Sequence, residues 1–272
     1  MTNRGLGARH AEVQRLRALA RDRHARRTEH AFLLEGPLLL EAALDRGAPL
    51  EAVYLGYGAR AAFPALLARL TATGIPVQDL REGVLEKVGT TRTPQPVLAV
   101  ATLPTDPQLP PDGDVLVAVD VADPGNLGTM IRSAEAAGAT AVVVTGASVD
   151  PHNPKTGRST AGAIFGIPIL EEPDPAAALD TLHARGRHTV GTAATGGHPA
   201  ATLDVTVPLA LVVGNEAHGL APDVQTRLDD IVTIPMHGAA ESLNVAMAAT
   251  VLLFDLDRRR THTPTAPTGP AR

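Results

Sequence analysis

Residues 123–139, DPGNLGTMIRSAEAAGA, begin with glycines at 125 and 128 and carry an asparagine and an arginine, soon after the apolar run DVLVAVDV. An apolar run followed by glycines at a helix start is typical of loops that cradle a phosphate. Asn126 and Arg132 offer other chemistry, because an amide and a guanidinium can orient a hydroxyl or stabilise an anion. The segment therefore predicts either a dinucleotide-binding turn or a site built around these two side chains.

A dinucleotide-binding turn has the pattern G-x-G-x-x-G, with an acidic residue at the end of the next strand. Gly125 and Gly128 do not have this spacing, and the next apolar run ends in VVVTG without a carboxylate. The sequence therefore disfavours a nicotinamide-dependent oxidoreductase.

The helix that follows is expected over residues 126–137. Four apolar residues recur at helical spacing and are predicted to face the core: Leu127, Met130, Ile131 and Ala134. Gly128 and Arg132 share another face, so Arg132 is expected to project where Gly128 leaves room for a ligand. At the helix start, Asn126 is equally typical of an N-cap, and Arg132 can pair with Glu135 at the surface.

Two α/β units are expected on either side of a proline-rich linker, residues 104–114. Residues 29–103 alternate strand and helix and form the smaller unit. Residues 115–258 alternate more regularly, which predicts a mostly parallel sheet with helices on both faces. The tail, residues 259–272, is rich in proline and threonine and is expected to be disordered.

Ligands bind at the carboxyl ends of the strands in such sheets. Three glycine-rich or polar loops are expected there: residues 191–197, 214–220 and 235–244. The last helix is expected over residues 242–257, with Ser242 as its N-cap. One apolar stripe is predicted to pack this helix: Leu243, Met247, Val251 and Phe254. Asn244 lies off that stripe and is therefore available for another role.

Positive charge is concentrated at the N-terminus. The chain has a net charge of −5, yet residues 1–30 hold eight arginines against three acidic residues. A basic helix or arm over residues 1–28 can follow nucleic-acid phosphates, and an ordinary solvated helix face is the alternative. The arginines predicted to make such contacts are Arg9, Arg15, Arg23, Arg26 and Arg27. With no Trp and few other aromatic residues, the sequence disfavours a base-stacking platform of the single-strand-binding type.

Other features of the sequence narrow the class of protein. The chain has no cysteine, and it shows neither a signal peptide nor an apolar run long enough to span a membrane. These features predict a cytoplasmic protein without a membrane segment. His218 and His237 have no third ligand in a metal-binding pattern, so no metal site is expected.

Three motifs follow successive strands of the larger unit. They are N-x-G-x-x-x-R with a downstream A-x-x-x-G, then LVVGNEAHGL, then IPMHGAAESLNVAMAATVLLFDL. In this order they resemble the three motifs of the SpoU (TrmH) family of RNA 2′-O-ribose methyltransferases, over about residues 114–258. The earlier segment FLLEGPLLLEAALDRG resembles the RNA substrate-binding domain that many members carry.

The resemblance implies S-adenosylmethionine as cofactor, a C-terminal trefoil knot and an obligate homodimer with the active site near its interface. It places the cofactor between loops 192–197, 214–219 and 234–243. The cofactor-binding residues it implies are Thr192, Ala193, Ala194, Gly214, Asn215, Glu216, Ile234, Met236, Ser242 and Leu243. The catalytic residues it implies are Arg132, Asn126, Glu216, Ser242 and Asn244. Arg158 and Ser159 are expected to contact substrate RNA.

Physical chemistry gives these residues provisional roles. A guanidinium stays protonated in proteins, so Arg132 is better suited to clamp a phosphate or stabilise a ribose oxyanion than to act as a base. Asn126 and Asn244 can orient Arg132 or the ribose. Glu216 can hold the guanidinium in a charge-assisted pair.

The sequence leaves open which RNA is methylated. The separate N-terminal unit favours ribosomal RNA over transfer RNA, and both housekeeping methylation and self-protection against an antibiotic fit the sequence. A non-catalytic RNA-binding module would be expected to lack Arg132 or Asn244, and both are present. The dimer interface is expected on the apolar side of helix 126–137 or on the last helix.

Overall fold

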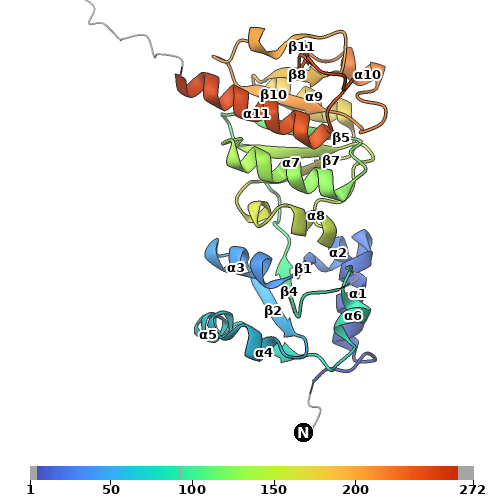
Figure 1. Cartoon of the computed structure of the whole chain (residues 1–272), viewed down its shortest axis with the longest axis vertical. Coiled ribbons are helices and arrows are strands. Elements are labelled where there is room, and N and C mark those ends of the chain that lie inside the picture. The colour runs from blue at the N-terminus through green and yellow to red at the C-terminus, as the bar shows by residue number, and fades with distance from the viewer. Residues whose placement is uncertain (1–4, 92, 263–272) are drawn as a thin grey trace, which may run out of the picture.

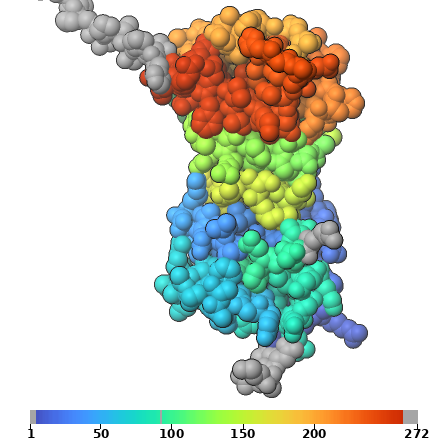
Figure 2. Space-filling model, in the orientation of Figure 1, coloured from blue at the N-terminus to red at the C-terminus, as the bar shows by residue number. Residues whose placement is uncertain are grey.

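The computed structural model describes residues 5–91 and 93–262, which form two α/β units stacked along the long axis of the molecule (Figure 1). The first unit has a four-stranded sheet in the order β1-β4-β2-β3, and the second has a seven-stranded sheet in the order β7-β6-β5-β10-β8-β11-β9. Figure 2 shows the two units in direct contact at the waist of the molecule.

The first unit has helices on both faces of its sheet. Its strands are β1 (Ala31–Glu35), β2 (Leu50–Leu55), β3 (Val77–Asp79) and β4 (Val97–Thr102). Its helices are α1 (Ala11–Arg21), α2 (Arg23–Glu29), α3 (Pro37–Asp45), α4 (Ala59–Ala62), α5 (Pro64–Thr73) and α6 (Leu85–Val88). β1 and β2 pair antiparallel with β4. Phe32 and Leu34 pack in the core that contains α3 and α5, whereas Leu33 packs with α1, because successive strand residues point to opposite faces.

The basic N-terminal segment is part of the first unit. Val13, Leu16 and Leu19 of α1 have no exposed surface, and they share a core with Leu33 of the sheet. In the described residues the segment expected as an arm over residues 1–28 is therefore a layer of this unit. The arginines dominate its composition, but its apolar residues recur at helical spacing and bury one face.

The second unit is built on parallel strands, as predicted. Its strands are β5 (Val115–Val119), β6 (Ala141–Thr145), β7 (Ile169–Glu172), β8 (His188–Thr192), β9 (His198–Pro199), β10 (Leu209–Val213) and β11 (Asp230–Thr233). Its helices are α7 (Pro124–Ala136), α8 (Pro154–Ser159), α9 (Pro175–Ala184), α10 (Pro222–Gln225) and α11 (Val245–His262), with short 3-10 turns η1 (Ala163–Phe165) and η2 (Ala200–Thr202). α7 and α11 cover one face, and α9 and α10 cover the other. None of the described helices meets the length and hydropathy needed to cross a bilayer.

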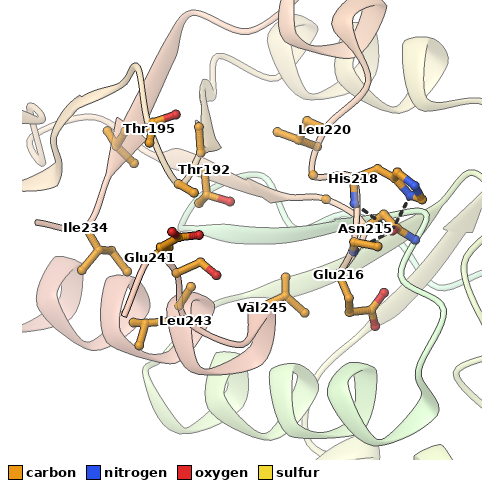
Figure 3. A pocket seen from close by; sticks show the side chains of 18 of the residues that line it. Thr192, Thr195, Asn215, Glu216, His218, Leu220, Ile234, Glu241, Leu243 and Val245 are labelled. Atoms are coloured by element: carbon orange, nitrogen blue, oxygen red, sulfur yellow. Dashed lines mark hydrogen bonds between the residues drawn. The ribbon is translucent and has the colours of Figure 1, made fainter. Parts of the chain in front are cut away.

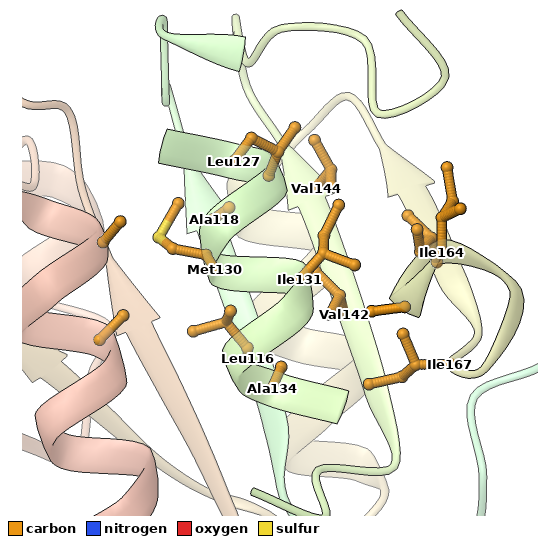
Figure 4. Packing of buried hydrophobic residues seen from close by; sticks show 14 of the residues in the cluster. Leu116, Ala118, Leu127, Met130, Ile131, Ala134, Val142, Val144, Ile164 and Ile167 are labelled. Carbon is orange, nitrogen blue, oxygen red and sulfur yellow. The ribbon is translucent and has the colours of Figure 1, made fainter. Parts of the chain in front are cut away.

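Helix α7 packs on β5 and β6 by the face that the sequence predicts (Figure 4). Four of its residues have no exposed surface: Leu127, Met130, Ile131 and Ala134. They lie in one core with strand residues that include Leu116, Ala118, Val142 and Val144. This apolar face is buried inside the chain, so of the two dimer surfaces expected from the sequence, helix 126–137 and the last helix, the first is not available.

Two expectations at the start of α7 are corrected. The N-cap is Asp123, whose carboxylate accepts a hydrogen bond from the backbone amide of Asn126 at 2.9 Å, so Asn126 lies inside the first turn. Gly128 does not leave room for a ligand. A Cβ there would lie 2.5 Å from the Ser159 Cβ and 2.5 Å from the Thr156 carbonyl oxygen, so the glycine lets α8 approach α7.

Helix α11 turns the expected apolar stripe outward. Met247, Val251 and Phe254 are 61%, 48% and 45% exposed. Other residues of the helix face the sheet: Ala246, Ala249, Leu252, Leu253 and Leu256. The sequence carries two apolar stripes on this helix, and spacing alone does not say which one is buried.

The last helix is also longer than expected. It continues to His262, and Arg259 donates to the carbonyl of Ala200 at 2.9 Å. The tail expected from residue 259 is therefore helical over its first four residues. The rest of that expectation, residues 263–272, lies outside the described residues.

Arginine–carboxylate pairs join the two units. Arg26 of α2 lies 2.6 Å from Asp150, and both side chains are buried. In the opposite direction, Arg158 of α8 lies 2.5 Å from Glu35, at the end of β1. The other pairs between the units are Arg23–Glu171, Arg27–Glu171 and Arg46–Glu135. Removing one partner of a buried ion pair strongly destabilises a protein. These pairs therefore fix how the two units are oriented relative to each other.

The predicted linker, residues 104–114, is held against the second unit. Leu109 is 7% exposed. Arg187 donates to the carbonyls of Pro110 and Gly113, at 2.7 and 3.0 Å. These contacts anchor the segment that precedes β5.

Candidate active site

A cavity of about 480 Å³ lies at the carboxyl ends of β8, β10 and β11 (Figure 3). The three loops singled out from the sequence form its walls, as expected for ligand sites in parallel sheets. All ten residues predicted to bind a cofactor line it: Thr192, Ala193, Ala194, Gly214, Asn215, Glu216, Ile234, Met236, Ser242 and Leu243. A set of residues spread over more than 50 positions of the sequence is thus brought to one place.

The cavity has lining residues that the sequence analysis missed. Among them are Thr195, His218, Leu220, Gln225, Glu241, Val245 and Leu252. Ile234, Leu243 and Val245 supply apolar surface from two sides (Figure 3). His218 and Leu220 belong to the motif stretch 214–220, so the motif could have identified them as lining residues. Leu252 was not, because a leucine in the third turn of a helix is typical of a core.

The loop between β10 and α10 closes tightly on itself. The Asn215 amide donates to the Gly219 carbonyl at 3.0 Å, and the Gly219 amide donates back at 2.9 Å. A Cβ on Gly214 would lie 2.3 Å from the Gly219 carbonyl carbon. Only glycine at position 214 permits this approach, and the turn presents Asn215 and Glu216 to the cavity.

We expect Gly214→Ala to weaken S-adenosylmethionine binding by about tenfold, because the loop must open to avoid the added methyl group. Isothermal titration calorimetry measures the change. Gly238→Ala is the matched control, since a Cβ there meets nothing within 4 Å. Wild-type affinity in the Gly214 variant would mean that this loop is not a wall of the cofactor site.

Three polar side chains form a hydrogen-bonded chain beside the cavity. Asn126 of α7 donates through Nδ2 to Glu216 Oε1 at 2.9 Å. Asn244 donates through Nδ2 to Asn126 Oδ1 at 3.0 Å. Residues from all three motifs therefore meet in one network, and each fixes the orientation of the next.

Glu216 has a different partner from the one expected. Its carboxylate accepts the backbone amides of Ala122 and Asp123, at 3.1 and 3.0 Å, in addition to Asn126. Burial opposes ionisation of this carboxyl, but the hydrogen bonds from Asn126 and the two amides outweigh it and hold the pKa of Glu216 below its ordinary value. The expected pair with the guanidinium of Arg132 is not formed, because Glu216 is occupied in fixing the start of α7.

The N-cap of α11 is Asn244, and the prediction of Ser242 as the cap is wrong. Asn244 Oδ1 accepts the backbone amides of Ala246 and Met247, at 2.9 and 3.3 Å, so Asn244 caps α11. Ser242 is exposed and lines the cavity. The helix starts three residues later than expected, which moves the cap from the serine to the asparagine.

Arg132 is exposed on α7 and does not line the cavity. On the surface of α7, Arg132 lies between Gly128, which faces α8, and Ser133. The Ser133 hydroxyl forms a hydrogen bond of 2.7 Å with the Thr250 hydroxyl of α11. The surface pair with Glu135 is not formed, since Glu135 lies 2.6 Å from Arg46. Within the described residues Arg132 makes no ion pair, so its guanidinium is available to an anion from outside the chain.

Most arginines predicted to contact RNA are paired inside the protein. Arg15 lies within ion-pair distance of three carboxylates: Glu12, Glu29 and Glu51. Arg23, Arg26 and Arg27 belong to the pairs that join the units, and so does Arg158. Arg26 is 2% exposed, so in this arrangement it is a structural residue and its predicted RNA contact is corrected.

Arg9 and Ser159 are placed differently from these arginines. Arg9 is exposed just before α1. The Ser159 hydroxyl donates to the Lys155 carbonyl at 3.1 Å, and its Cβ lies against α7. A contact of either residue with RNA stays a prediction.

One group in the described part of the chain has the composition of a metal site: Asp150, His152 and Glu171. Its carboxylates are already engaged, because Asp150 pairs with Arg26 and Glu171 pairs with arginines of α2. Burial lowers the pKa of His152, which keeps this ring neutral. The negative charges of this group are therefore paired with arginines at the junction of the two units.

A parallel sheet with a cavity at the carboxyl ends of its strands, and with a polar network beside it, defines an α/β enzyme that binds a small cofactor there. Comparison with known families specifies the class. Residues 114–254 match the SpoU rRNA Methylase family, and residues 10–99 match the MRM3-like substrate binding domain. The chain belongs to the SpoU rRNA methylase family, so the family predicted from the three motifs is confirmed.

Two named relatives are similar over most of the chain. A 23S rRNA (guanosine(2553)-2′-O)-methyltransferase of Bacillus subtilis is 38% identical, over 84% of this chain and 88% of that protein. A 23S rRNA (uridine(2479)-2′-O)-methyltransferase of Streptomyces viridochromogenes is 34% identical, over 97% of this chain and 96% of that protein. The prediction of an RNA 2′-O-methyltransferase is confirmed at the level of the enzyme class.

A solved structure is similar in both units. The SpoU methyltransferase AviRb from Streptomyces viridochromogenes, in complex with the cofactor AdoMet, superposes with a TM-score of 0.83 and 30% identity, over 93% of this chain and 99% of that chain. AdoMet is S-adenosylmethionine, the cofactor that the motifs implied. The cofactor prediction is confirmed for the family.

Proposed function

We propose that this protein transfers a methyl group from S-adenosylmethionine to a ribose 2′-hydroxyl of 23S ribosomal RNA. One observation carries the proposal: the ten residues of the cofactor pattern line a single cavity, and the network of Asn126, Glu216 and Asn244 lies beside it. The two named relatives act on 23S rRNA. Because the proposed substrate is ribosomal RNA, we also propose that the protein acts in the cytoplasm.

The cavity fits the cofactor in size and chemistry. Its volume of about 480 Å³ is within the range of small-molecule sites. Apolar side chains such as Ile234 and Leu243 supply walls for an adenine ring, and the tight turn at Gly214 brings backbone close to the ligand. When bound, the cofactor supplies an activated methyl group on a sulfonium.

The chain's own residues position the reaction. With the cofactor bound, its sulfonium would supply the methyl group to the ribose 2′-oxygen, and the hydroxyl proton would leave to water. Asn126 is held between Glu216 and Asn244, so its amide is fixed before RNA arrives. Arg132, without an internal partner in the described residues, stabilises the ribose oxyanion or holds a neighbouring phosphate.

Calorimetric titration of the purified protein tests the cofactor. S-adenosylmethionine is expected to bind, and NAD is not, because the turn at residues 125–128 lacks the glycine pattern and the acidic residue of dinucleotide sites. S-adenosylhomocysteine, which has lost the methyl group, is a control that should also bind. Binding of NAD without binding of S-adenosylmethionine would refute the proposal.

We also propose that the protein is a homodimer that pairs through α11. Met247, Val251 and Phe254 form an exposed apolar face on this helix, and apolar patches of this kind mark interfaces. α7 packs beside α11, so Arg132 lies near this face. This agrees with the active site near the interface that the family resemblance implies.

The trefoil knot stays part of the proposal. The sheet order supports it, because β10 lies between β5 and β8 although it follows both in the chain. A chain that threads through its own loop produces such an order, and threaded connections are rare. The cavity loops 192–197, 214–219 and 234–243 are the ones that the knot would bring together.

A further inference from the structure

The cations of the first unit divide into two kinds. On α4 and α5 each arginine has a carboxylate partner: Arg60 lies 2.8 Å from Asp79, and Arg69 lies 2.6 Å from Asp45. On α1, Arg15 is surrounded by three carboxylates. These side chains are neutralised within the protein, so they offer little to a phosphate.

The other kind, without an ion pair in the described residues, includes Arg17, Arg21 and Lys87 as well as Arg9 and Arg81. Among these described cations, only the first three are joined by hydrogen bonds to one another's backbone or side chains. Arg17 Nε and Arg21 Nη2 both donate to the backbone carbonyl of Lys87, at 3.2 and 3.3 Å. None of the three has an ion pair with a carboxylate of the described residues. Arg21 and Lys87 are exposed, and Arg17 is partly exposed.

Bringing two guanidinium groups to one carbonyl has an energetic cost. Arg17 and Arg21 are four residues apart on α1, where like charges repel. Asp22 and Glu86 are adjacent in sequence to Arg21 and Lys87, but in the described residues neither forms an ion pair with the three cations, and Asp22 caps α2 through the amide of His24. A bound anion would remove the repulsion.

The location of these cations suits an RNA that reaches the active site. In Figure 1, α1 and α6 lie on the same side of the molecule as α10 and the start of α11, where the cavity lies. α4 and α5, whose arginines are paired, and α3, which Arg46 follows, lie on the opposite side. Arg17, Arg21 and Lys87 are therefore on the side of the cofactor cavity.

We propose that Arg17, Arg21 and Lys87 form a phosphate-binding patch that holds the backbone of the substrate RNA beside the first unit. The inference rests on the proposed function and identifies the surface that its substrate contacts. The two arginines are already oriented by one carbonyl, and each retains further N–H donors for a phosphate. Lys87 adds a mobile charge at the edge of the patch.

The triple variant Arg17→Gln, Arg21→Gln, Lys87→Gln tests the patch. Each phosphate contact releases counterions when RNA binds. Without the three contacts, the magnitude of the slope of log K against log salt should decrease by about two to three. At physiological salt, RNA should bind about a hundredfold more weakly. Filter binding of deproteinised 23S rRNA over a salt series measures both, and S-adenosylmethionine affinity should stay unchanged.

The control triple is Arg60→Gln, Arg69→Gln, Arg227→Gln, which removes the same charge from exposed arginines that have carboxylate partners. It should keep the wild-type salt slope. A second variant, Arg17→Lys with Arg21→Lys, keeps the charge and should keep the slope. A patch triple with the wild-type slope, or a lysine variant as weak as the triple, would overturn the patch.

Failure of the patch and failure of the proposed function are separable. If the wild-type protein methylates RNA but the patch triple has its salt slope, the patch is wrong and the function stands. If the wild-type protein methylates no ribose in 23S rRNA, the proposed function is wrong, whatever the salt slope.

Discussion

Replacing Arg132 with alanine is expected to slow methyl transfer by a factor of about a hundred or more. This is the scale of losing one preorganised donor that stabilises charge in the transition state. S-adenosylmethionine affinity should change little, because Arg132 does not line the cavity. Single-turnover transfer of a radiolabelled methyl group and calorimetry measure the two quantities.

Arg132→Lys separates charge from geometry. A lysine keeps the positive charge but lacks the planar fork of a guanidinium. Partial activity would assign Arg132 a charge role, and near-total loss would assign it a geometric one. Arg227→Ala, at another exposed arginine, is the control and should be fully active. Normal methylation by Arg132→Ala would contradict a catalytic role for this side chain.

Charging the exposed face of α11 is expected to convert a dimer into a monomer. In Val251→Glu with Phe254→Glu, two carboxylates would be buried without partners if the helices paired, which is strongly unfavourable. We expect light scattering to give twice the chain mass for the wild type and one chain mass for the variant. Methyl transfer should be lost with the dimer, since the site lies near this face.

The matched control carries the same charges on the first unit. Leu38→Glu with Tyr57→Glu alters two exposed apolar residues, which are 74% and 80% exposed. This variant should stay dimeric and active. Circular dichroism establishes that both variants are folded. A wild-type monomer that methylates RNA would rule out the α11 dimer.

The cofactor cavity could be predicted because its residues lie in loops, where polar and glycine-rich stretches have few structural reasons to exist. The strand β10 and the tight turn at Gly214 after it fix the positions of Asn215 and Glu216 at the end of the sheet. The partner of Glu216 was not predictable. Whether a carboxylate meets a guanidinium or two backbone amides depends on a few ångströms of tertiary structure, which spacing does not encode.

The main limit on predicting the fold from the sequence was deciding which face of a helix is buried. On α7 there is one apolar face, and it is buried as expected. On α11 both Leu253 and Phe254 belong to apolar stripes, and only the sheet beneath decides that Leu253 is buried while Phe254 is exposed. The strand β7, ILEE, carries two acidic residues at an edge of the sheet, a composition that does not by itself predict a strand.

The arginines show a similar limit. Sequence alone places Arg15, Arg17 and Arg26 in one basic segment. The fold then surrounds Arg15 with carboxylates, buries Arg26 against Asp150 and leaves Arg17 without a carboxylate partner in the described residues. Charge counted along a chain therefore does not identify the cations that can bind RNA, because pairing depends on residues that are distant in sequence.

The proposed function is tested most directly by incubating the purified protein with S-adenosylmethionine and 23S rRNA from a strain that lacks its gene. Mass spectrometry of the digested RNA then reports every methylated nucleoside. We expect one new 2′-O-methylnucleoside, at a single position, that is absent without S-adenosylmethionine and strongly reduced with Arg132→Ala. A methyl group on a base, or no methylation of 23S rRNA at all, would contradict ribose 2′-O-methylation as the function of this protein.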